Sequence, residues 1–397
     1  MKEWKTYRLG DIITISSGFP YKGEFIGKGN NYLLGMGCVS FKETFLKSGL
    51  RQYSGDAPER YIAQPGDIVL ATRQQSDNLP ILGMPAIIPQ AYNGYKMIIG
   101  ANLYKVQNES EFSNAYIYWL MKSPAYVHHI KSCQTGTTVR MITKANIEDF
   151  TFKAPEKSER DKIASFLWNI EEKIAINRQI NDNLEQQAQN IFNHYFIDNP
   201  IELGSYSEGV LTDIAVYLNG LAMQKFRPEG SDFGLPVLKI KELGQRSCDN
   251  NSDRCSSLIK EEYIVNDGDV IFSWSGTLLV DLWCGGKCGL NQHLFKVTSD
   301  TYPKWFYYFW TKHHLDNFIR VAKDKAVTMG HIKRTELEKA NIIVPTQDKL
   351  SEINRIMSPI ITKIINHRIE MRKLAQLRDS LLPQLMSGEL KINEIDC

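Results

Sequence analysis

The chain has 397 residues, of which 43% are hydrophobic and 23% charged, and its formal net charge is +2. This length exceeds a single ordinary core, so two or more domains are expected, and no apolar run approaches the roughly 20 residues that a membrane span needs. Seven scattered cysteines, and no apolar stretch after the first charges, favour a reduced, cytoplasmic protein without a secretory leader.

Charge alone does not predict a nucleic-acid partner. Basic and acidic residues number 16 and 12 in residues 1–152, 6 and 8 in 153–199, 17 and 18 in 200–340, and 8 and 7 in 341–397. Only the first segment is modestly basic, well below a strong nucleic-acid footprint. Cys284 and Cys288 form the closest cysteine pair, but no second pair follows at zinc-finger spacing, so no metal site is expected.

The chain is a tandem repeat. An offset of 202 relates Asp11 to Asp213, Gly18 to Gly220, and Asp67 to Asp269. Further along, offsets of 191 and then 190 relate Tyr116 to Tyr307, Thr138 to Thr328, and Ile170 to Ile360. So few offsets over so many positions indicate a duplication, in which the second copy has lost about a dozen residues.

Each copy begins with about 150 residues of mixed secondary structure. Residues 68–71 and 270–273 are short apolar runs that follow Gly-Asp turns, so both are predicted to be strands. Residues 114–122 and 303–312 are rich in aromatic side chains and are predicted to be helices; the aromatic stripe 305–310 is predicted to lie in the core. The expected unit is a compact α+β globule built mainly on twisted sheet.

Each copy ends in a long helix with a hydrophobic seam. The seam positions alternate by four and three residues, which is the 3.5-residue period of a coiled coil. In the first copy they are Ile163, Leu167, Ile170, Ile174, Asn177, Asn181, Leu184, Ala188, Ile191 and Tyr195. A shift of 190 gives Ile353, Met357, Ile360, Ile364, His367, Met371, Leu374, Arg378, Leu381 and Leu385. Ser358 and Pro359 have the form of an N-cap and a first helical residue, so the second helix is expected to restart or kink there.

Such a seam must be buried, and the simplest partner is the seam of the other copy. A pseudo-twofold arrangement would pack the two helices as an antiparallel coiled coil. The predicted fold class is α+β, with two similar mixed α/β globules separated by two long helices. The first globule, the central helical spacer, the second globule and the distal helical spacer with its tail are expected at residues 1–152, 153–199, 200–341 and 342–397.

The expected helix length suits a DNA reader but does not require one. Thirty-odd helical residues span roughly 45–50 Å at about 1.5 Å each. Since dimeric DNA readers place two modules one helical turn apart on a duplex, this length favours two recognition globules on one DNA. An adaptor with two protein-binding globules on a coiled-coil spacer remains the alternative.

Local signatures resemble those of the specificity subunits of type I restriction–modification enzymes. Residues 136–150, Gly-Thr-Thr-Val-Arg-Met-Ile-Thr-Lys-Ala-Asn-Ile-Glu-Asp-Phe, are similar to the segment that closes a target-recognition domain in that family. Residues 377–390, Leu-Arg-Asp-Ser-Leu-Leu-Pro-Gln-Leu-Met-Ser-Gly-Glu-Leu, resemble the end of the family's distal conserved region. The Pro-Gly-Asp-Ile turn at 65–68 also fits, whereas residues 326–332 of the second copy lack the Gly-Thr-Thr start.

This resemblance implies a non-catalytic, sequence-specific DNA-binding subunit that reads a bipartite target, one half-site per globule. It also implies docking of two adenine-methylating subunits and of restriction and translocase subunits. S-adenosylmethionine, ATP and Mg²⁺ would bind only to those partners. The chain contains neither the Asn/Asp-Pro-Pro-Tyr/Phe motif of adenine methyltransferases nor a Gly-x-x-x-x-Gly-Lys-Ser/Thr phosphate loop. A related system whose partner fuses methyltransferase and nuclease is a further alternative.

Candidate DNA contacts in the first globule follow from the chemistry of the duplex. Base edges are read by Arg, Lys, Asn and Gln, while phosphates bind Lys, Arg, Thr and backbone amides. A polar run directly after a predicted strand is the candidate base reader, and the closing segment is the candidate phosphate site. The first set is Arg73, Gln74, Gln75 and Asn78, and the second is Thr137, Thr138, Arg140 and Lys144. A solvated hairpin tip and a structural turn are the competing interpretations.

The second globule has candidates at corresponding places. Residues 273–276, which include the candidates Ser273 and Trp274, fall where residues 71–73 fall in the first copy, although Trp274 also suits a core position. The closing segment is cationic and either contacts DNA or forms a solvated face; its candidates are Lys323, Lys325, His331, Lys333 and Arg334.

Three seam positions are polar, namely Asn177, Asn181 and His367. Polar residues at such positions set helix register at some cost in stability, because burying them unpaired costs roughly 1–3 kcal/mol. Docking of a methyltransferase subunit is the competing explanation.

Overall fold

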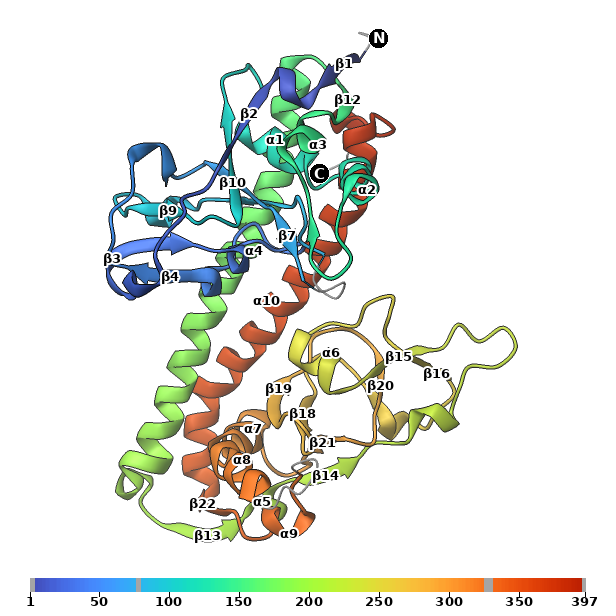
Figure 1. The fold of residues 1–397 in the computed structure, drawn as a ribbon. Helices are drawn as coiled ribbons and strands as arrows, with labels where there is room; N and C mark the ends of the chain where they lie inside the picture. The colour runs from blue at the N-terminus through green and yellow to red at the C-terminus, as the bar shows by residue number, and fades with distance from the viewer. Residues whose placement is uncertain (1–3, 76–79, 325–330, 395–397) are drawn as a thin grey trace. The chain divides into compact units, whose positions relative to one another are not determined.

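The computed structural model describes residues 4–75, 80–324 and 331–394, and the chain divides into two compact units (Figure 1). Unit 1 comprises Met1–Lys173 and Leu374–Cys397, and unit 2 comprises Ile174–Lys373. Two long helices, α4 (Lys157–Asn193) and α10 (Gln347–Ser387), contribute to both units. The units divide inside these helices, because each globule packs against both helices.

The two globules contain the same pair of four-stranded sheets. In the first globule, one sheet has the strand order β2 (Ile13–Ser17), β10 (Leu103–Asn108), β6 (Ile68–Ala71), β8 (Pro85–Ile87). The other sheet has the order β4 (Leu50–Tyr53), β3 (Ile26–Leu34), β9 (Met97–Ile99), β5 (Ile62–Ala63). In the second globule, the sheet equivalent to the first of these has the order β14 (Val216–Asn219), β21 (Leu294–Thr298), β18 (Val270–Ser273), β19 (Leu279–Leu282). The other has the order β16 (Arg254–Cys255), β15 (Leu235–Leu238), β20 (Cys288–Leu290), β17 (Ile264–Val265). The equivalent pairs β3–β9 and β15–β20 are both parallel. The sequence duplication is therefore a duplication of topology.

Short elements complete each globule. A two-stranded pair precedes each long helix, β1 (Lys5–Arg8) with β12 (Thr151–Ala154) and β13 (Tyr206–Val210) with β22 (Asn341–Pro345). The helices of the first globule are α1 (Asn114–Leu120), α2 (Pro124–Cys133) and α3 (Lys144–Glu148). Those of the second are α5 (Leu211–Ile214), α6 (Ile240–Gln245), α7 (Lys304–His313), α8 (Leu315–Asp324) and α9 (Arg334–Leu337). All six aromatic residues from Trp305 to Trp310 are buried, which confirms the predicted core role of that stripe.

A glycine joins the two sheets of each globule at equivalent places. A Cβ on Gly18 would lie 2.1 Å from the Gly100 carbonyl oxygen, and one on Gly220 would lie 2.3 Å from the Asn291 carbonyl oxygen. Any side chain there would collide with backbone, so only glycine permits the approach. The next residue in each copy then forms a parallel bridge, Phe19 with Gly100 and Leu221 with Asn291.

The Gly-Asp turns before β6 and β18 also have one repeated structure. Gly66 and Gly268 have φ angles of 86° and 89°, which favour glycine. The Asp67 carboxylate accepts a hydrogen bond from Gln64 N at 2.9 Å and lies 3.2 Å from Lys105 Nζ. Asp269 makes the equivalent contacts with Asn266 N and Lys296 at the same distances. The two copies therefore fold by the same local interactions.

The predicted seam is buried in the first half of α4, whereas later apolar positions such as Leu184, Ile191 and Met371 are half-buried. Ile163, Leu167, Ile170 and Ile174 are all less than 8% exposed. Helix α10 continues through Pro359, so the expected restart there is wrong. The Ser358 hydroxyl donates to Asn354 Oδ1 in the preceding turn and so does not cap a new helix.

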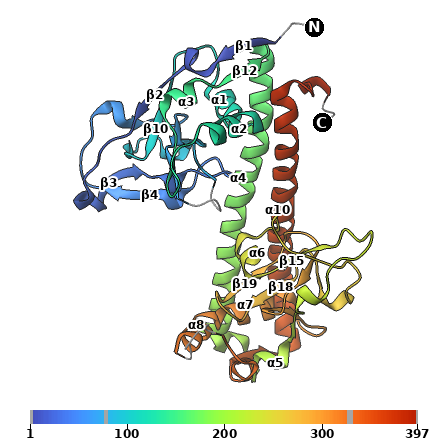
Figure 2. The same cartoon turned by 45° about the vertical axis from the view of Figure 1, so that its right-hand side comes forward.

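The polar seam residues pair across the two helices within unit 2. Asn177 Nδ2 donates to Glu370 Oε2 at 2.8 Å, and Asn181 Nδ2 donates to the Ile364 carbonyl at 3.1 Å. His367 Nδ1 lies 3.1 Å from Asn181 Oδ1. Going from Asn177 to Asn181 along α4, the partner on α10 changes from Glu370 to the earlier His367, so the helices are antiparallel here, as expected. Figure 2 shows the two helices side by side.

A buried arginine connects the second globule to both helices. Arg368 of α10 donates to Glu185 of α4 at 2.6 Å, and to Asp281 of β19 at 2.8 Å. It also donates to the Leu282 carbonyl at 2.9 Å. Burial opposes the charge of Arg368, but the two carboxylates outweigh it and raise its pKa above the ordinary value. Arg368 is not one of the predicted seam positions, so the sequence pattern did not predict this buried charge.

We predict that Arg368→Met lowers the free energy of unfolding by about 3–5 kcal/mol, because it leaves two carboxylates without their buried partner. Lys363→Met is the matched control, since Lys363 lies exposed on the same helix, and it should change stability by less than about 0.5 kcal/mol. Urea unfolding of the full-length chain, followed by circular dichroism, measures both values. Equal effects of the two substitutions would contradict the assigned role of Arg368.

Candidate nucleic-acid interface

In the first globule, two predicted segments that are far apart in sequence lie together. Strand β7 (Arg73–Gln74) pairs with β11 (Arg140–Met141), which places Arg140 opposite Gln74. Arg73 and Gln75 are exposed, as a base reader requires. Gln74 is only 7% exposed, and its Oε1 accepts a hydrogen bond from Leu82 N at 3.2 Å, so its prediction as a base reader is corrected to a structural role. Asn78 lies outside the described residues.

The closing segment of the first globule adds cations and hydroxyls to this surface. Thr137 and Thr138 are exposed, after a Gly136 whose Cβ would lie 2.2 Å from the Val139 carbonyl oxygen. Lys144 Nζ lies 5.7 Å from the centroid of the Tyr104 ring. Burial raises the pKa of Tyr104, and the nearby Arg73 guanidinium offsets part of that rise. We call Arg73, Arg140 and Lys144 the first cationic surface.

In the second globule, the predicted residues are less available. Ser273 is fully buried, and its hydroxyl donates to the carbonyls of Ser275 and Thr277 at 3.2 and 2.8 Å, so its prediction as a DNA contact is wrong. Trp274 is half-buried, and its indole N–H donates to Asn219 Oδ1 at 3.0 Å. Ser275 forms a bridge with His331, which is equivalent to the pairing of Arg73 with Met141 in the first globule.

The remaining predicted cations of the second globule are exposed. Lys333 and Arg334 lie at the start of α9, and Lys323 lies in the last turn of α8. The structure places His331 beside Trp274, with ring centroids 6.3 Å apart. Lys325 lies outside the described residues.

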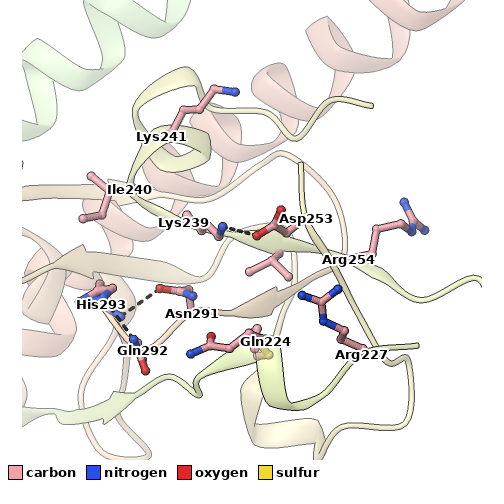
Figure 3. A pocket seen from close by; sticks show the side chains of 12 residues that line it. Gln224, Arg227, Lys239, Ile240, Lys241, Asp253, Arg254, Asn291, Gln292 and His293 are labelled. Atoms are coloured by element: carbon pink, nitrogen blue, oxygen red, sulfur yellow. Dashed lines mark hydrogen bonds and ion pairs between the residues drawn. The ribbon is translucent and has the colours of Figure 1, made fainter. Parts of the chain in front are cut away.

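Sequence reasoning missed a cavity of about 520 Å³ in the second globule (Figure 3). We call it the second-globule cavity. Its lining is cationic and rich in amides, with one carboxylate. The lining residues are Met223, Gln224, Arg227, Val237, Lys239, Ile240, Lys241, Asp253, Arg254, Asn291, Gln292 and His293. This combination matches the side chains that bind phosphates and read base edges.

Several of these polar groups have partners inside the protein, among them Arg254, which donates to the carbonyls of Phe233 and Gly234. Lys239 forms an ion pair with Asp253, and this pair, with a smaller contribution from Arg227, lowers the pKa of that carboxyl. Asn291 Oδ1 accepts from His293 N at 3.3 Å, and Gln292 Nε2 lies 3.3 Å from His293 Nε2 (Figure 3).

The first globule has a smaller cavity at the equivalent place, of about 230 Å³. The pairing of Val237 with Gly289 corresponds to that of Leu33 with Ile98. This aligns Lys239 with Gly35, and Lys241 with Gly37, both of which line the smaller cavity. The same frame therefore carries different side chains in the two copies.

One sequence signal could have located both cavities. The repeated Gly18 and Gly220 mark the point where the two sheets meet. Gly220 packs against the backbone of Asn291, and Asn291 also lines the second-globule cavity. The cations themselves gave no signal, because Arg227, Lys239 and Arg254 are separated by a dozen residues or more.

Comparison with known proteins identifies the class to which this fold and surface belong. The family described as type I restriction modification DNA specificity domain matches residues 1–186 and 208–374. The chain belongs to this family, as its sequence signatures indicated.

Relatives of similar length support this assignment. The type I restriction enzyme MjaIX specificity subunit of Methanocaldococcus jannaschii is 23% identical, over 99% of this chain and 95% of the relative. The HindI specificity subunit of Haemophilus influenzae is 20% identical, over 98% of this chain and the whole relative. The crystal structure of the type I restriction–modification S subunit from M. genitalium has the same fold, with a TM-score of 0.60, 12% identity, and coverage of 97% and 96%.

Two findings concern other classes of site. Within residues 4–75, 80–324 and 331–394, no three His, Cys, Asp or Glu side chains gather as a metal site. Over the same described ranges, no helix has the length and apolarity to cross a membrane.

We predict that Asp253→Asn tightens binding to duplex DNA of any sequence, because it removes the one carboxylate from the second-globule cavity and releases Lys239. One additional phosphate contact would steepen the slope of log K against log salt concentration by up to about 0.9. Asp300→Asn removes an exposed acid of the same globule that does not line the cavity, and it should change the slope less. Fluorescence anisotropy across a salt series measures the slopes; identical slopes for both variants would contradict a DNA-facing cavity.

Proposed function

We propose that this chain supplies DNA sequence specificity to a type I restriction–modification enzyme, with each globule reading one half of a split target. The observation that carries this proposal is that the two globules repeat the same strands around a cavity, while the residues that line the two cavities differ. Equivalent strands and an equivalent glycine crossing hold a concave site in each globule. Lys239 and Lys241 of one site correspond to Gly35 and Gly37 of the other. Two sites on the same frame with different side chains suit two different half-sites.

In this proposal the chain does not catalyse methyl transfer or cleavage. The sequence contains no adenine-methyltransferase motif and no phosphate loop, as noted above. The chain would dock two methyltransferase subunits, and restriction and translocase subunits would join that assembly. S-adenosylmethionine, ATP and Mg²⁺ would bind to those partners.

The adaptor alternative is disfavoured by the chemistry of the surfaces. An adaptor with two protein-binding globules needs no salt-dependent DNA binding. The second-globule cavity instead combines four Lys and Arg side chains with three amides. Protein interfaces have cores depleted in charge, whereas DNA interfaces are strongly cationic.

We expect the two globules to specify independently. Replacing residues 1–152 with the matching domain of another family member should change one half-site and leave the other unchanged. Methylome sequencing of a host that expresses the chimaera with its methyltransferase subunits reads both halves at once. The purified chain alone, given duplex DNA and S-adenosylmethionine, is the control and should transfer no methyl group. A change in both halves, or methylation by the chain alone, would contradict the proposal.

Within the first cationic surface, we predict different effects for Arg73 and Lys144. Arg73→Ala should relax selection at a single base position at a cost of about 1–3 kcal/mol, because its exposed guanidinium is suited to a base edge. Lys144→Ala should weaken binding to all sequences and flatten the salt slope by about 1. Affinities for a set of single-base variants of the target, measured at two salt concentrations, separate these outcomes. The same uniform loss for both variants would remove Arg73 from the base-reading residues.

A further inference from the structure

The second globule presents two almost fully exposed apolar side chains on adjacent loops. Phe233 is 91% exposed and Leu258 is 87% exposed. Single exposed apolar residues are common and need no explanation by themselves. Here the loop structure and the neighbouring charges supply the explanation.

The loop that carries Phe233 is held in one conformation by side-chain hydrogen bonds. The Asp232 carboxylate accepts from Gly234 N at 2.7 Å, from Ser256 Oγ at 2.8 Å, and from both N and Oγ of Ser257 at 2.9 and 2.8 Å. Arg254 donates to the carbonyls of Phe233 and Gly234 at 2.7 and 2.6 Å. A fixed loop loses little conformational freedom on binding, so its exposed ring is already organised for a partner.

The loop held by Asp232 and Arg254 also needs glycine at one position. Gly234 has a φ of 66°, and a Cβ there would lie 2.5 Å from the Cys255 carbonyl oxygen. Its backbone therefore approaches β16 more closely than any other residue would allow. This approach places Phe233 next to the strand from which Arg254 extends.

The same Arg254 lines the second-globule cavity together with Arg227 and Lys239 (Figure 3). Phe233 therefore lies at a cationic rim. DNA provides phosphates for the cations of this cavity and base faces for the ring, and the Asp232 carboxylate in the same loop is taken up by hydrogen bonds from Gly234, Ser256 and Ser257. Proteins that bend DNA insert apolar side chains between base pairs beside basic residues in this way.

We propose that Phe233 is a DNA wedge, whose ring stacks on a base pair of the second half-site while the cations of the second-globule cavity hold the flanking phosphates. Leu258, fixed through Ser256 and Ser257 to the same Asp232, adds a second apolar contact. This inference rests on the proposed function, since it assigns a residue to one half of the DNA target.

The wedge is particular to the second copy. Strand β3 changes register between Ile26 and Asn31, so the equivalent loop is located by its glycine. Gly29 has a φ of 85° and a Cβ there would lie 2.9 Å from the Tyr53 carbonyl oxygen, as one on Gly234 would approach Cys255. The residue before this glycine is Lys28 in the first globule, where the second has Phe233. Distortion of the DNA is therefore expected in the second half-site.

The test uses the full-length chain in complex with its methyltransferase subunits and duplexes that carry 2-aminopurine at successive positions of each half-site, omitting the methylated adenine. The wild-type complex should raise the fluorescence at one step of the second half-site. Phe233→Ala should abolish this rise and weaken binding roughly 5- to 150-fold, as expected for loss of a base–aromatic stack. Phe233→Trp should retain both signal and affinity.

Two further variants separate the wedge from other causes. Phe233→Ala should leave the salt slope unchanged, whereas Arg227→Ala should flatten it by about 0.9, because only the arginine releases counterions. Ile201→Ala is the matched control, since Ile201 is 84% exposed in the same unit and does not line the cavity. It should behave as the wild type does.

Each contrary outcome has a distinct meaning. Wild-type signal and affinity in Phe233→Ala, with specific binding intact, would overturn the wedge and leave the proposed function standing. Release of a methyltransferase subunit by Phe233→Ala in size-exclusion chromatography, without any loss of a fluorescence signal, would assign the ring to a protein contact and also overturn the wedge. Absence of specific, salt-dependent binding by the wild-type complex would overturn the proposed function and the wedge together.

Discussion

The glycine crossing is the constraint on which each globule depends. Gly18 N donates to the Leu103 carbonyl at 2.9 Å, and Gly220 N donates to the Leu294 carbonyl at 3.0 Å. These bonds extend the pairing of β2 with β10 and of β14 with β21. The next residue in each copy then bonds to the other sheet, Phe19 N to the Ile99 carbonyl at 2.7 Å and Leu221 N to the Leu290 carbonyl at 3.0 Å, and the glycine before it passes too close to that backbone for a Cβ. The concave sites lie at this junction, since Gly100 lines the smaller cavity and Asn291 lines the second-globule cavity. A larger residue at the crossing would alter the site by moving the sheets apart, without touching any side chain that lines it.

A fixed frame allows the lining to vary. Side chains at the positions of Lys239 and Lys241 extend from the end of β15 and the start of α6, so their identity has little effect on the pairing of β15 with β20. The first globule has glycine at both positions and still keeps the equivalent pairing of β3 with β9. Stability therefore depends on the strands and the crossing, whereas recognition depends on the residues that follow them.

The sequence predicted the features that repeat with a period. The heptad seam predicted the buried face of the first half of α4, although beyond it Phe192 is buried in place of the half-buried Ile191. The constant offsets predicted the duplication that the strand orders confirm. Single base-reading candidates were harder to predict, because Arg73 and Gln74 are neighbours in a strand and successive side chains point to opposite faces. Treating that run as a loop hid the fact that Gln74 faces inward between the exposed Arg73 and Gln75. The second-globule cavity had no local signal, since its cations come together only through tertiary pairing.

Buried charge couples the helices of unit 2 to its recognition globule. A non-polar seam alone would tolerate a shift of one heptad, because equivalent apolar positions recur every seven residues. Such a shift would separate Arg368 from Glu185, and Asn181 from His367, at the same time. Since Arg368 also binds Asp281 of β19, and β19 belongs to the sheet that the glycine crossing joins to the cavity, one side chain ties the helix register to the globule. The orientation of the second-globule cavity on its helices is thus fixed by the interaction that selects how those helices pair.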